Sequence, residues 1–301
     1  MVERGDNMNF YKKKPSDYIF SFLNGAFMIF LAVITLYPFL YVLFASLSDP
    51  VKFMTYKGVL LHPISLNLES YRSVLNNPNI LTGYRNTLFI VITGTVINVV
   101  FTSMGAYFLS RRGPLLKKPV MLLIMITMFI SGGMIPKYLL IQQLGMYNSL
   151  WSLIIPGAIS TFNMIIMRTA FQGIPAGLEE SAMIDGANDW VILFKLILPL
   201  SLPTMAVIGL YYAVGHWNSW FSANLYLADR KLFPLQLILR NIIVNSEVDD
   251  MTVGIGSGQS YAMSFTIKYA TVMVATVPIL VVYPFIQKYF VKGVMIGSLK
   301  E

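Results

Sequence analysis

The sequence predicts an all-α protein, a polytopic membrane helical bundle with six transmembrane helices. Of its 301 residues, 56% are hydrophobic and 12% are charged, and the mean hydropathy is +0.65. A soluble domain of similar length is much less apolar. Six continuous stretches contain no Asp, Glu, Lys or Arg, namely 18–48, 86–110, 119–136, 138–167, 196–228 and 269–287. Each can hold one spanning helix, whereas membrane β-strands would alternate polar and apolar residues.

Charges, prolines and glycines set the limits of the first three helices. Lys12–Lys14 precede the first apolar run, which is too long for the core of a cleavable signal peptide, so we keep it as a helix. Asp49–Pro50 and Asn77–Pro78 are turn signals in the outer segment that follows. Arg111–Pro114 predict a tight turn on the inner side, and Ser131–Gly133 predict an irregular outer end. We therefore expect helices at about 18–48, 86–110 and 120–135.

The second half of the chain holds the other three helices and the longest inner loop. We expect these helices at about 150–167, 200–221 and 269–287, with the inner loop at 168–199. In the outer segment between the last two helices, the glycine-rich stretch Gly254–Gly258 predicts a flexible loop, because no phosphate-binding Lys-Ser or Lys-Thr follows it. The six-helix domain thus occupies 18–290, between polar tails at 1–17 and 291–301.

The basic residues predict the orientation in the membrane. With the N-terminus inside, thirteen of the 22 Lys and Arg residues fall on the cytoplasmic side, and the others are spread over longer outer segments. Basic residues concentrate in short cytoplasmic segments, so we expect both termini inside, N-in/C-in. The formal net charge of +8 is explained by loops beside an anionic membrane surface and requires no nucleic acid.

The inner loop is predicted to form a helix, a turn and a second helix. Gly177 precedes a short acidic segment suited to a helix start, and Asp185–Gly186 is a turn signal. The second segment ends at Pro199 and places apolar residues at spacings of three and four, namely Trp190, Val191, Phe194, Ile197 and Leu198. Lipid, the protein's own bundle or a partner protein must cover such a face, and the residues alone leave all three open.

The same loop resembles the signature of binding-protein-dependent ABC permeases. Glu180-Ser181-Ala182, Gly186, Leu196 and Leu198-Pro199 occur at the family spacing, with Ser181 in place of Ala and Leu196 in place of Ile. The resemblance implies the type I ABC importer permease fold and a coupling loop that docks on an ATPase. It implies Glu180 as the ionic anchor, Gly186 as the turn, and Ala182 with Met183 packed against the ATPase. The full set of implied coupling residues is Glu179, Glu180, Ser181, Ala182, Met183, Asp185, Gly186, Ala187, Leu198 and Pro199.

Three further stretches resemble the carbohydrate branch of these permeases: Asp185–Ala187, Tyr211–Phe221, and the tail from Tyr283 through Gly297. The resemblance implies a bacterial cytoplasmic membrane protein that imports complex saccharides such as oligosaccharides. It implies four kinds of partner, namely a second homologous permease forming a heterodimer, two ATPase subunits, an extracellular solute-binding protein and membrane lipid. We expect no cofactor or metal in this chain, since ATP and Mg²⁺ would bind the ATPase.

Several polar and aromatic residues within or beside the spans are candidates for the substrate path: Asn98, Asn163, Tyr212, Trp217, Asn218 and Trp220. Aromatic faces stack on sugar rings, but tryptophans also anchor helices at membrane interfaces, and both interpretations stay open. The asparagines either line the path or bond between helices, and the second interpretation is favoured. We expect His216 to be a hydrogen-bonded structural residue rather than a ligand or proton relay.

Two other classes of function fit the residues less well. A secondary transporter driven by an ion gradient usually needs ionisable groups inside the membrane, and apart from His216 the six runs have none. A membrane enzyme would need clustered Asp, Glu, Ser or His at the membrane face, and no such cluster occurs. The chain also lacks a complete nucleotide-binding motif. The leading prediction is a non-catalytic permease subunit driven by a separate ATPase.

Overall fold

The computed structural model describes residues 15–111, 116–251 and 258–298, and within these ranges the chain is almost entirely helical. A single isolated bridge between Ser48 and Leu66 is the β contact found there. The elements are α1 (Pro15–Ser46), α2 (Pro50–Thr55), α3 (Glu69–Leu75), α4 (Pro78–Ser110), α5 (Lys117–Phe129), α6 (Met134–Gln143), α7 (Trp151–Ile154), η1 (Ile155–Gly157), α8 (Thr161–Gln172), α9 (Ala176–Ile184), α10 (Asp189–Val191), η2 (Ile192–Ile197), α11 (Leu198–Leu200), α12 (Leu202–Trp217), α13 (Trp220–Tyr226), η3 (Arg230–Leu232), α14 (Leu235–Met251) and α15 (Gly258–Ser298). The all-α prediction is confirmed.

Three stretches in the described part of the chain are single helices long and apolar enough to cross a membrane: Ser16–Ser46, Pro78–Ser110 and Ala262–Pro284. The second begins eight residues before the predicted start. Asn77 caps it by accepting a hydrogen bond from the Asn79 amide, and Pro78 occupies the first turn, where its missing N–H costs nothing. A single charge, Arg85, does not interrupt a helix that begins with a good cap.

Three more spans are possible only if a bent pair of helices counts as one. The pairs are Lys117–Phe129 with Met134–Gln143, bent by 114°, Trp151–Gly157 with Thr161–Gln172, bent by 51°, and Asp189–Leu200 with Leu202–Trp217, bent by 87°. The first bend falls at the predicted irregular segment, where Gly133 has φ +83°. Counting every pair gives up to six spans by length and composition, so the six-span count stays a prediction.

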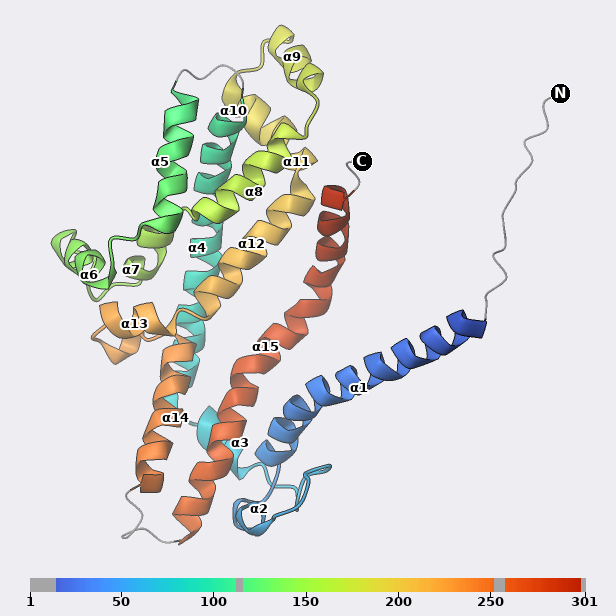
Figure 1. Cartoon of the computed structure of the whole chain (residues 1–301). Helices are drawn as coiled ribbons and strands as arrows, with labels where there is room; N and C mark the ends of the chain where they lie inside the picture. The colour runs from blue at the N-terminus through green and yellow to red at the C-terminus, as the bar shows by residue number, and fades with distance from the viewer. Residues whose placement is uncertain (1–14, 112–115, 252–257, 299–301) are drawn as a thin grey trace.

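The two ends of the molecule differ in what they carry. The short helices α9 and α10 lie at one end, and α2 and α3 lie at the other with the start of α15 (Figure 1). Helix α15 runs between these ends and continues to Ser298, so the expected C-terminal tail begins inside a helix. The expected glycine-rich loop falls mainly on residues 252–257, outside the described residues.

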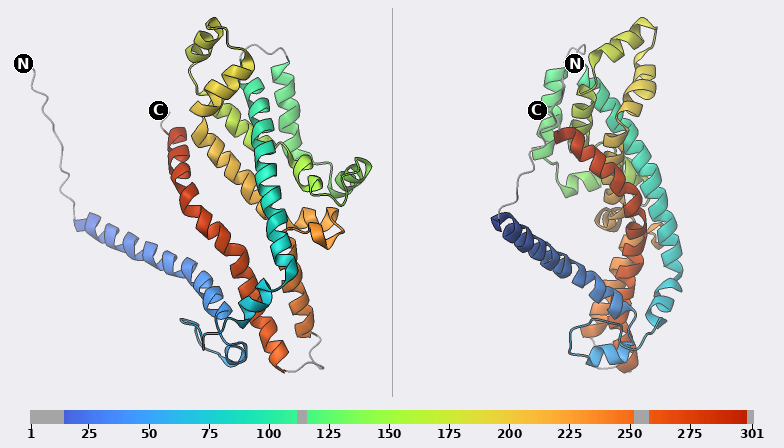
Figure 2. Two further views of the ribbon diagram at one scale, coloured as in Figure 1. Left: turned by 180° about the vertical axis from the view of Figure 1, so that it is seen from behind. Right: turned by 90° about the vertical axis from the view of Figure 1, so that its right-hand side faces the viewer.

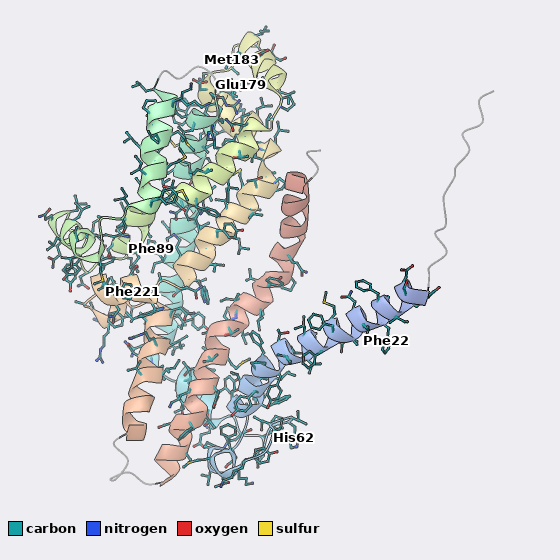
Figure 3. All side chains as sticks on the ribbon, viewed as in Figure 1. Phe22, His62, Phe89, Glu179, Met183 and Phe221 are labelled. Atoms are coloured by element: carbon teal, nitrogen blue, oxygen red, sulfur yellow. The ribbon has the colours of Figure 1, made fainter. Side chains whose placement is uncertain are left out.

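Helix α1 leaves the bundle over most of its length (Figure 2). Its C-terminal part packs against α15, but the most apolar 18-residue window of the helix is 0% buried. Phe22 lies on this uncovered part and is 74% exposed (Figure 3). The apolar surface of α1 must be covered by lipid or by another protein.

The rest of the bundle packs around three clusters of buried side chains. The cluster nearest α9 joins α4, α8, η2 and α12, and Phe171 and Ile208 at its centre are 0% exposed. A second cluster joins α4 to α6, α7, α13 and the start of α14. A third joins α3, α4, α14 and α15. Helix α4 contributes residues to all three clusters and so joins them to one another.

Candidate functional site

The inner loop folds as the predicted helix, turn and helix, and its turn is fixed by backbone hydrogen bonds. The Gly186 amide donates to Met183 O at 3.0 Å, and the Ala187 amide donates to Ala182 O at 2.9 Å. This pair of bonds is a Schellman motif, in which the residue after the helix cap takes a left-handed conformation. Gly186 has φ +80°, which glycine adopts without steric cost.

The second arm of the loop, α10 with η2 and α11, is buried by its apolar side chains. Asn188 caps its start by accepting a hydrogen bond from the Val191 amide at 2.9 Å. Ile192, Leu193 and Ile197 are at most 2% exposed and belong to the cluster with α4, α8 and α12. The helical segment runs to Leu200, one residue past Pro199, and then bends by 87° into α12.

The predicted apolar face of this arm is only partly correct. Ile197 and Leu198 pack on the protein's own core, one of the three covers left open by the sequence, whereas Trp190 and Phe194 stay 57% and 47% exposed and stack on each other at 6.2 Å between ring centroids. The cause is that Ile192–Ile197 form a π-helix, whose hydrogen bonds run from residue i to i+5. A face derived from 3.6 residues per turn does not hold through such a segment.

The first arm, α9, is exposed on almost every side. Leu178, Met183 and Ile184 are 45%, 49% and 86% exposed, and Glu180 is also exposed. Ala182 contacts the edge of the core, and Glu179 is the one residue of α9 that is buried. Figure 3 shows Glu179 and Met183 together at the end of the molecule that carries this helix.

The Glu179 carboxylate is held by Tyr107 in the last turn of α4 and by Arg111, the residue that follows this helix. Its Oε2 forms an ion pair with Nη1 of Arg111, and the two side chains are only 10% and 17% exposed. Its Oε1 accepts a hydrogen bond from the Tyr107 hydroxyl at 3.3 Å. The same hydroxyl lies 3.3 Å from Oδ1 of Asp189 on the second arm. The Arg111 guanidinium also stacks over the Tyr107 ring, 4.8 Å from its centroid. We call Tyr107, Arg111, Glu179 and Asp189 the clasp.

Basic side chains complete the end of α4. Lys117 donates to the Arg111 carbonyl at 2.7 Å, and the Arg168 Nε donates to the Leu109 carbonyl at 3.0 Å. Both bonds satisfy carbonyls that have no partner inside the helix, and cations stabilise the negative end of a helix dipole. Basic charge at this position thus has a structural role in addition to the topological one used in the sequence analysis.

A recess of about 1010 Å³ opens beside the clasp. Its wall includes Tyr107 from α4 and Arg111 just after it, Glu179 and Glu180 from α9, and Trp190 from the second arm. A metal site built from oxygen and nitrogen ligands needs several His, Asp or Glu side chains close together. No group of three such residues occurs in the described ranges. We assign no metal or cofactor to these residues.

Two of the predicted substrate-path residues serve the helix break between η1 and α8. Asn98 is 0% exposed and donates from Nδ2 to the Gly157 carbonyl at 2.6 Å. The Tyr212 hydroxyl accepts from the Ser160 amide at 2.9 Å and bonds to the Thr102 hydroxyl at 2.7 Å. A break in a membrane helix frees backbone groups that nothing in lipid can satisfy, and these side chains satisfy them. Asn98 therefore bonds between helices, and its place in a substrate path, like that of Tyr212, stays a prediction.

His216 is the buried, hydrogen-bonded residue that the sequence predicts. Its exposure is 8%, and its Nε2 donates to Oδ1 of Asn98 at 2.6 Å. The ring fits only because residue 94 is glycine: a Cβ built on Gly94 would lie 2.5 Å from Nε2 of His216. Helices α4 and α12 therefore approach each other closely here.

The other four path candidates do not converge on one site. Asn163 is buried at 5% exposure, and Trp217 is half-buried against the cluster of α3, α14 and α15. Trp220 lies under Arg240, whose guanidinium carbon is 4.5 Å from the ring centroid. Asn218 is exposed and its side-chain amide donates to the Val214 carbonyl at 3.0 Å. Their roles in a substrate path stay predictions.

The fold and the comparisons with known proteins agree on a class, a multi-pass permease subunit of an ABC importer in the bacterial cytoplasmic membrane. Residues 98–296 match the model of the Binding-protein-dependent transport system inner membrane component, and the chain belongs to this family. The matched range includes the helix–turn–helix loop and most of the bundle.

Similarity to individual proteins extends along nearly the whole chain. A polygalacturonan/rhamnogalacturonan transport system permease protein, YtcP of Bacillus subtilis (strain 168), is 43% identical over 94% of this chain and 98% of that protein. Protein LplC of the same organism is 38% identical over 94% of this chain and 95% of that protein. A crystal structure of a bacterial ABC transporter involved in the import of the acidic polysaccharide alginate contains a similar chain. Its TM-score is 0.83 at 32% identity, over 92% of this chain and 99% of that one. These similarities do not support the ion-coupled alternative.

Proposed function

We propose that this chain imports complex carbohydrates, as one of two permease subunits that together enclose the path. The observation that carries the proposal is the full-length similarity to a polygalacturonan/rhamnogalacturonan permease, with 43% identity over 94% of the chain. The similarity to a chain of an alginate importer points the same way, and both named polymers contain acidic sugars. The substrate class we propose is therefore an oligosaccharide derived from a complex polysaccharide.

The exposed arm α9 is our proposed docking surface for the ATPase subunits. In this proposal those subunits bind ATP and Mg²⁺, and this chain is not catalytic. Several exposed apolar side chains grouped on one short helix favour a contact with a partner, and on α9 Leu178, Met183 and Ile184 are 45%, 49% and 86% exposed. Glu180 lies exposed on the same short helix and is our ionic anchor. Ser181, Asp185, Ala187, Leu198 and Pro199 shape this surface or its turn.

We propose that a second, homologous permease packs against the exposed apolar surface of α1. This helix is apolar and its 18-residue apolar window is 0% buried, so a partner bundle beside it would cover a large apolar surface. With six spans and both termini inside, α9 faces the cytoplasm and α2 and α3 face outward, where a solute-binding protein delivers the saccharide. Our path candidates remain Asn98, Asn163, Tyr212, Trp217, Asn218 and Trp220, and within this set Asn98 and Tyr212 also bond the helices to one another.

The test is to co-express the chain with a neighbouring permease and ATPase from the same genome and purify the complex by a tag on this chain. We expect the ATPase to co-purify with the parent chain. Glu180→Ala should reduce its recovery and the ATP hydrolysis of the complex about tenfold, as expected for a lost charged contact at an interface. Lys118→Gln is the matched control, because Lys118 is an exposed charge beside the same end of α4 and outside the loop.

The substrate class is tested on the same complex with its binding protein, in vesicles loaded with ATP. Short oligogalacturonides and neutral maltooligosaccharides serve as the two probes. ATP-dependent uptake of the first is the expected result. If the ATPase does not co-purify, or if neither saccharide enters the vesicles with ATP, the proposed function is wrong.

A further inference from the structure

The starting point is how little attaches α9 to the bundle. Both of its covalent connections pass through a glycine, Gly173 after α8 and Gly186 before α10. Of its nine residues, only Glu179 is buried, and Ala182 is its one contact with the edge of the apolar core. The orientation of α9 therefore depends mainly on the polar contacts of Glu179.

Those contacts end on a single long helix. Arg111 and Tyr107 lie in the last turn of α4 and just beyond it, and α4 packs along its length on α8, α12 and α14. The guanidinium is itself fixed, by stacking on the Tyr107 ring and by donating from Nε to the Ser110 hydroxyl at 3.0 Å. A displacement of Glu179 must move the end of α4 or break an ion pair that is mostly shielded from water.

Tyr107 adds a link between the two arms. Its hydroxyl lies 3.3 Å from an oxygen of Glu179 on the first arm and 3.3 Å from an oxygen of Asp189 on the second. The side chain is 8% exposed, because it also belongs to the apolar cluster beneath the second arm. Tyr107 thus contacts the exposed arm, the buried arm and the core.

We propose that Arg111 and Tyr107 are positioning residues that make α9 and α4 move together, so that a displacement of the docked arm reaches the membrane-spanning bundle. This inference rests on the proposed docking of an ATPase on α9. It assigns Glu179 and Glu180, which are adjacent in the sequence, to opposite tasks. Glu180 faces the partner, and Glu179 faces inward and fastens the arm to α4.

The chain has no cysteine, so a pair of spin labels can be introduced without background. Gly177→Cys places one label on α9, where an added Cβ meets nothing within 4 Å. Phe101→Cys places the other on α4 at a side chain that is 45% exposed. The distance between the labels is measured by pulsed electron paramagnetic resonance on the assembled complex, without nucleotide and after trapping with ATP and vanadate.

In the otherwise unaltered complex we expect a narrow distance distribution that keeps its width after trapping. Glu179→Gln or Arg111→Gln should broaden it about twofold, because removing one partner of a shielded ion pair leaves the arm without its anchor. The double variant Arg111→Glu with Glu179→Arg should give a narrower distance distribution than either single charge reversal, since the effects of two residues in contact are not additive. Lys118→Gln serves again as the control of unchanged width.

The outcomes separate this inference from the proposed function. If the ATPase co-purifies with the Glu179→Gln complex and the labels keep the parental distribution, the clasp does not position α9 and the inference is wrong. Additive effects of the two charge reversals would also overturn it. If the ATPase fails to co-purify even with the parent chain, the docking proposal itself has failed. Retained ATPase binding with a broadened distribution is the result that supports the clasp.

Discussion

The two arms of the inner loop are held in opposite ways, although they are separated by only four residues. The second arm buries Ile192, Leu193 and Ile197 in the apolar core, whereas the first arm buries one carboxylate. Apolar packing is dense and tolerates little displacement, while a polar contact can be broken and remade at a defined distance. The loop therefore combines a second arm that is fixed by apolar packing with a first arm whose orientation depends on a few polar atoms.

Substitutions in the buried second arm should have the largest effect on stability. Ile197→Ala removes a side chain that is 0% exposed and leaves a cavity, which should cost about 2–5 kcal/mol of the free energy of unfolding. Thermal unfolding of the detergent-solubilised chain would measure the loss. Ile184→Ala, at 86% exposure, is the matched control. Equal losses of unfolding free energy in the two variants would contradict the conclusion that the second arm is packed in the core and the first arm is not.

The turn between the arms should show the next largest effect. Gly186→Val forces a branched side chain into φ +80°, at a cost of roughly 1–2 kcal/mol. It should also misplace α9 and reduce ATPase recovery with the complex. Gly186→Asn is the comparison, because asparagine is the residue that most often replaces glycine at this position. We expect it to retain most of the recovery, and a loss as large as that of valine would contradict the conformational explanation.

The clasp should show a smaller effect on stability. Tyr107→Phe removes one hydroxyl that lies near both arms and leaves the ring in the core, so the expected cost is about 1 kcal/mol. Thermal unfolding measures it, with Tyr56→Phe as a control in the exposed segment between α2 and α3. If the Tyr107 variant unfolds at the parental temperature, the hydroxyl contributes nothing to holding the first arm.

The outer surface of α9 should have the smallest effect on the chain alone and a clear one on assembly. Ile184→Ser changes an 86% exposed side chain, so the stability of the isolated chain should stay within about 0.5 kcal/mol. Recovery of the ATPase should nevertheless fall, because an apolar contact is lost from the proposed docking surface. Unchanged recovery would restrict that surface to the part of α9 nearer Glu180.

The sequence predicted the helices and the turn because these depend on local signals. Asp185–Gly186 is a turn signal whatever surrounds it, and continuous apolar runs indicate helices in a membrane. Ser131–Gly133 marked the place of the first bend, but the angles of 114°, 51° and 87° could not be predicted, since each depends on neighbouring helices that satisfy the freed backbone groups. The π-helix at Ile192–Ile197 likewise left no signal in the apolar spacing.

The clasp was beyond prediction for a different reason. In the sequence, Arg111 indicated the cytoplasmic side and a tight turn after the helix, and nothing near it points to a glutamate 68 residues later. Glu179 and Glu180 are chemically identical neighbours, and only the packing of α9 distinguishes the inward one from the exposed one. Tyr107 had no signal at all, because an aromatic residue in an apolar run is ordinary.

The close approach of α4 and α12 has an evolutionary consequence. Position 94 has room for no side chain while position 216 is histidine, since a Cβ would meet its ring nitrogen at 2.5 Å. A lineage that acquires alanine or serine at 94 must therefore displace or replace the His216 ring, and either change would leave the Asn98 carbonyl in need of a new donor. Among relatives of this permease, positions 94, 98 and 216 should change as a group.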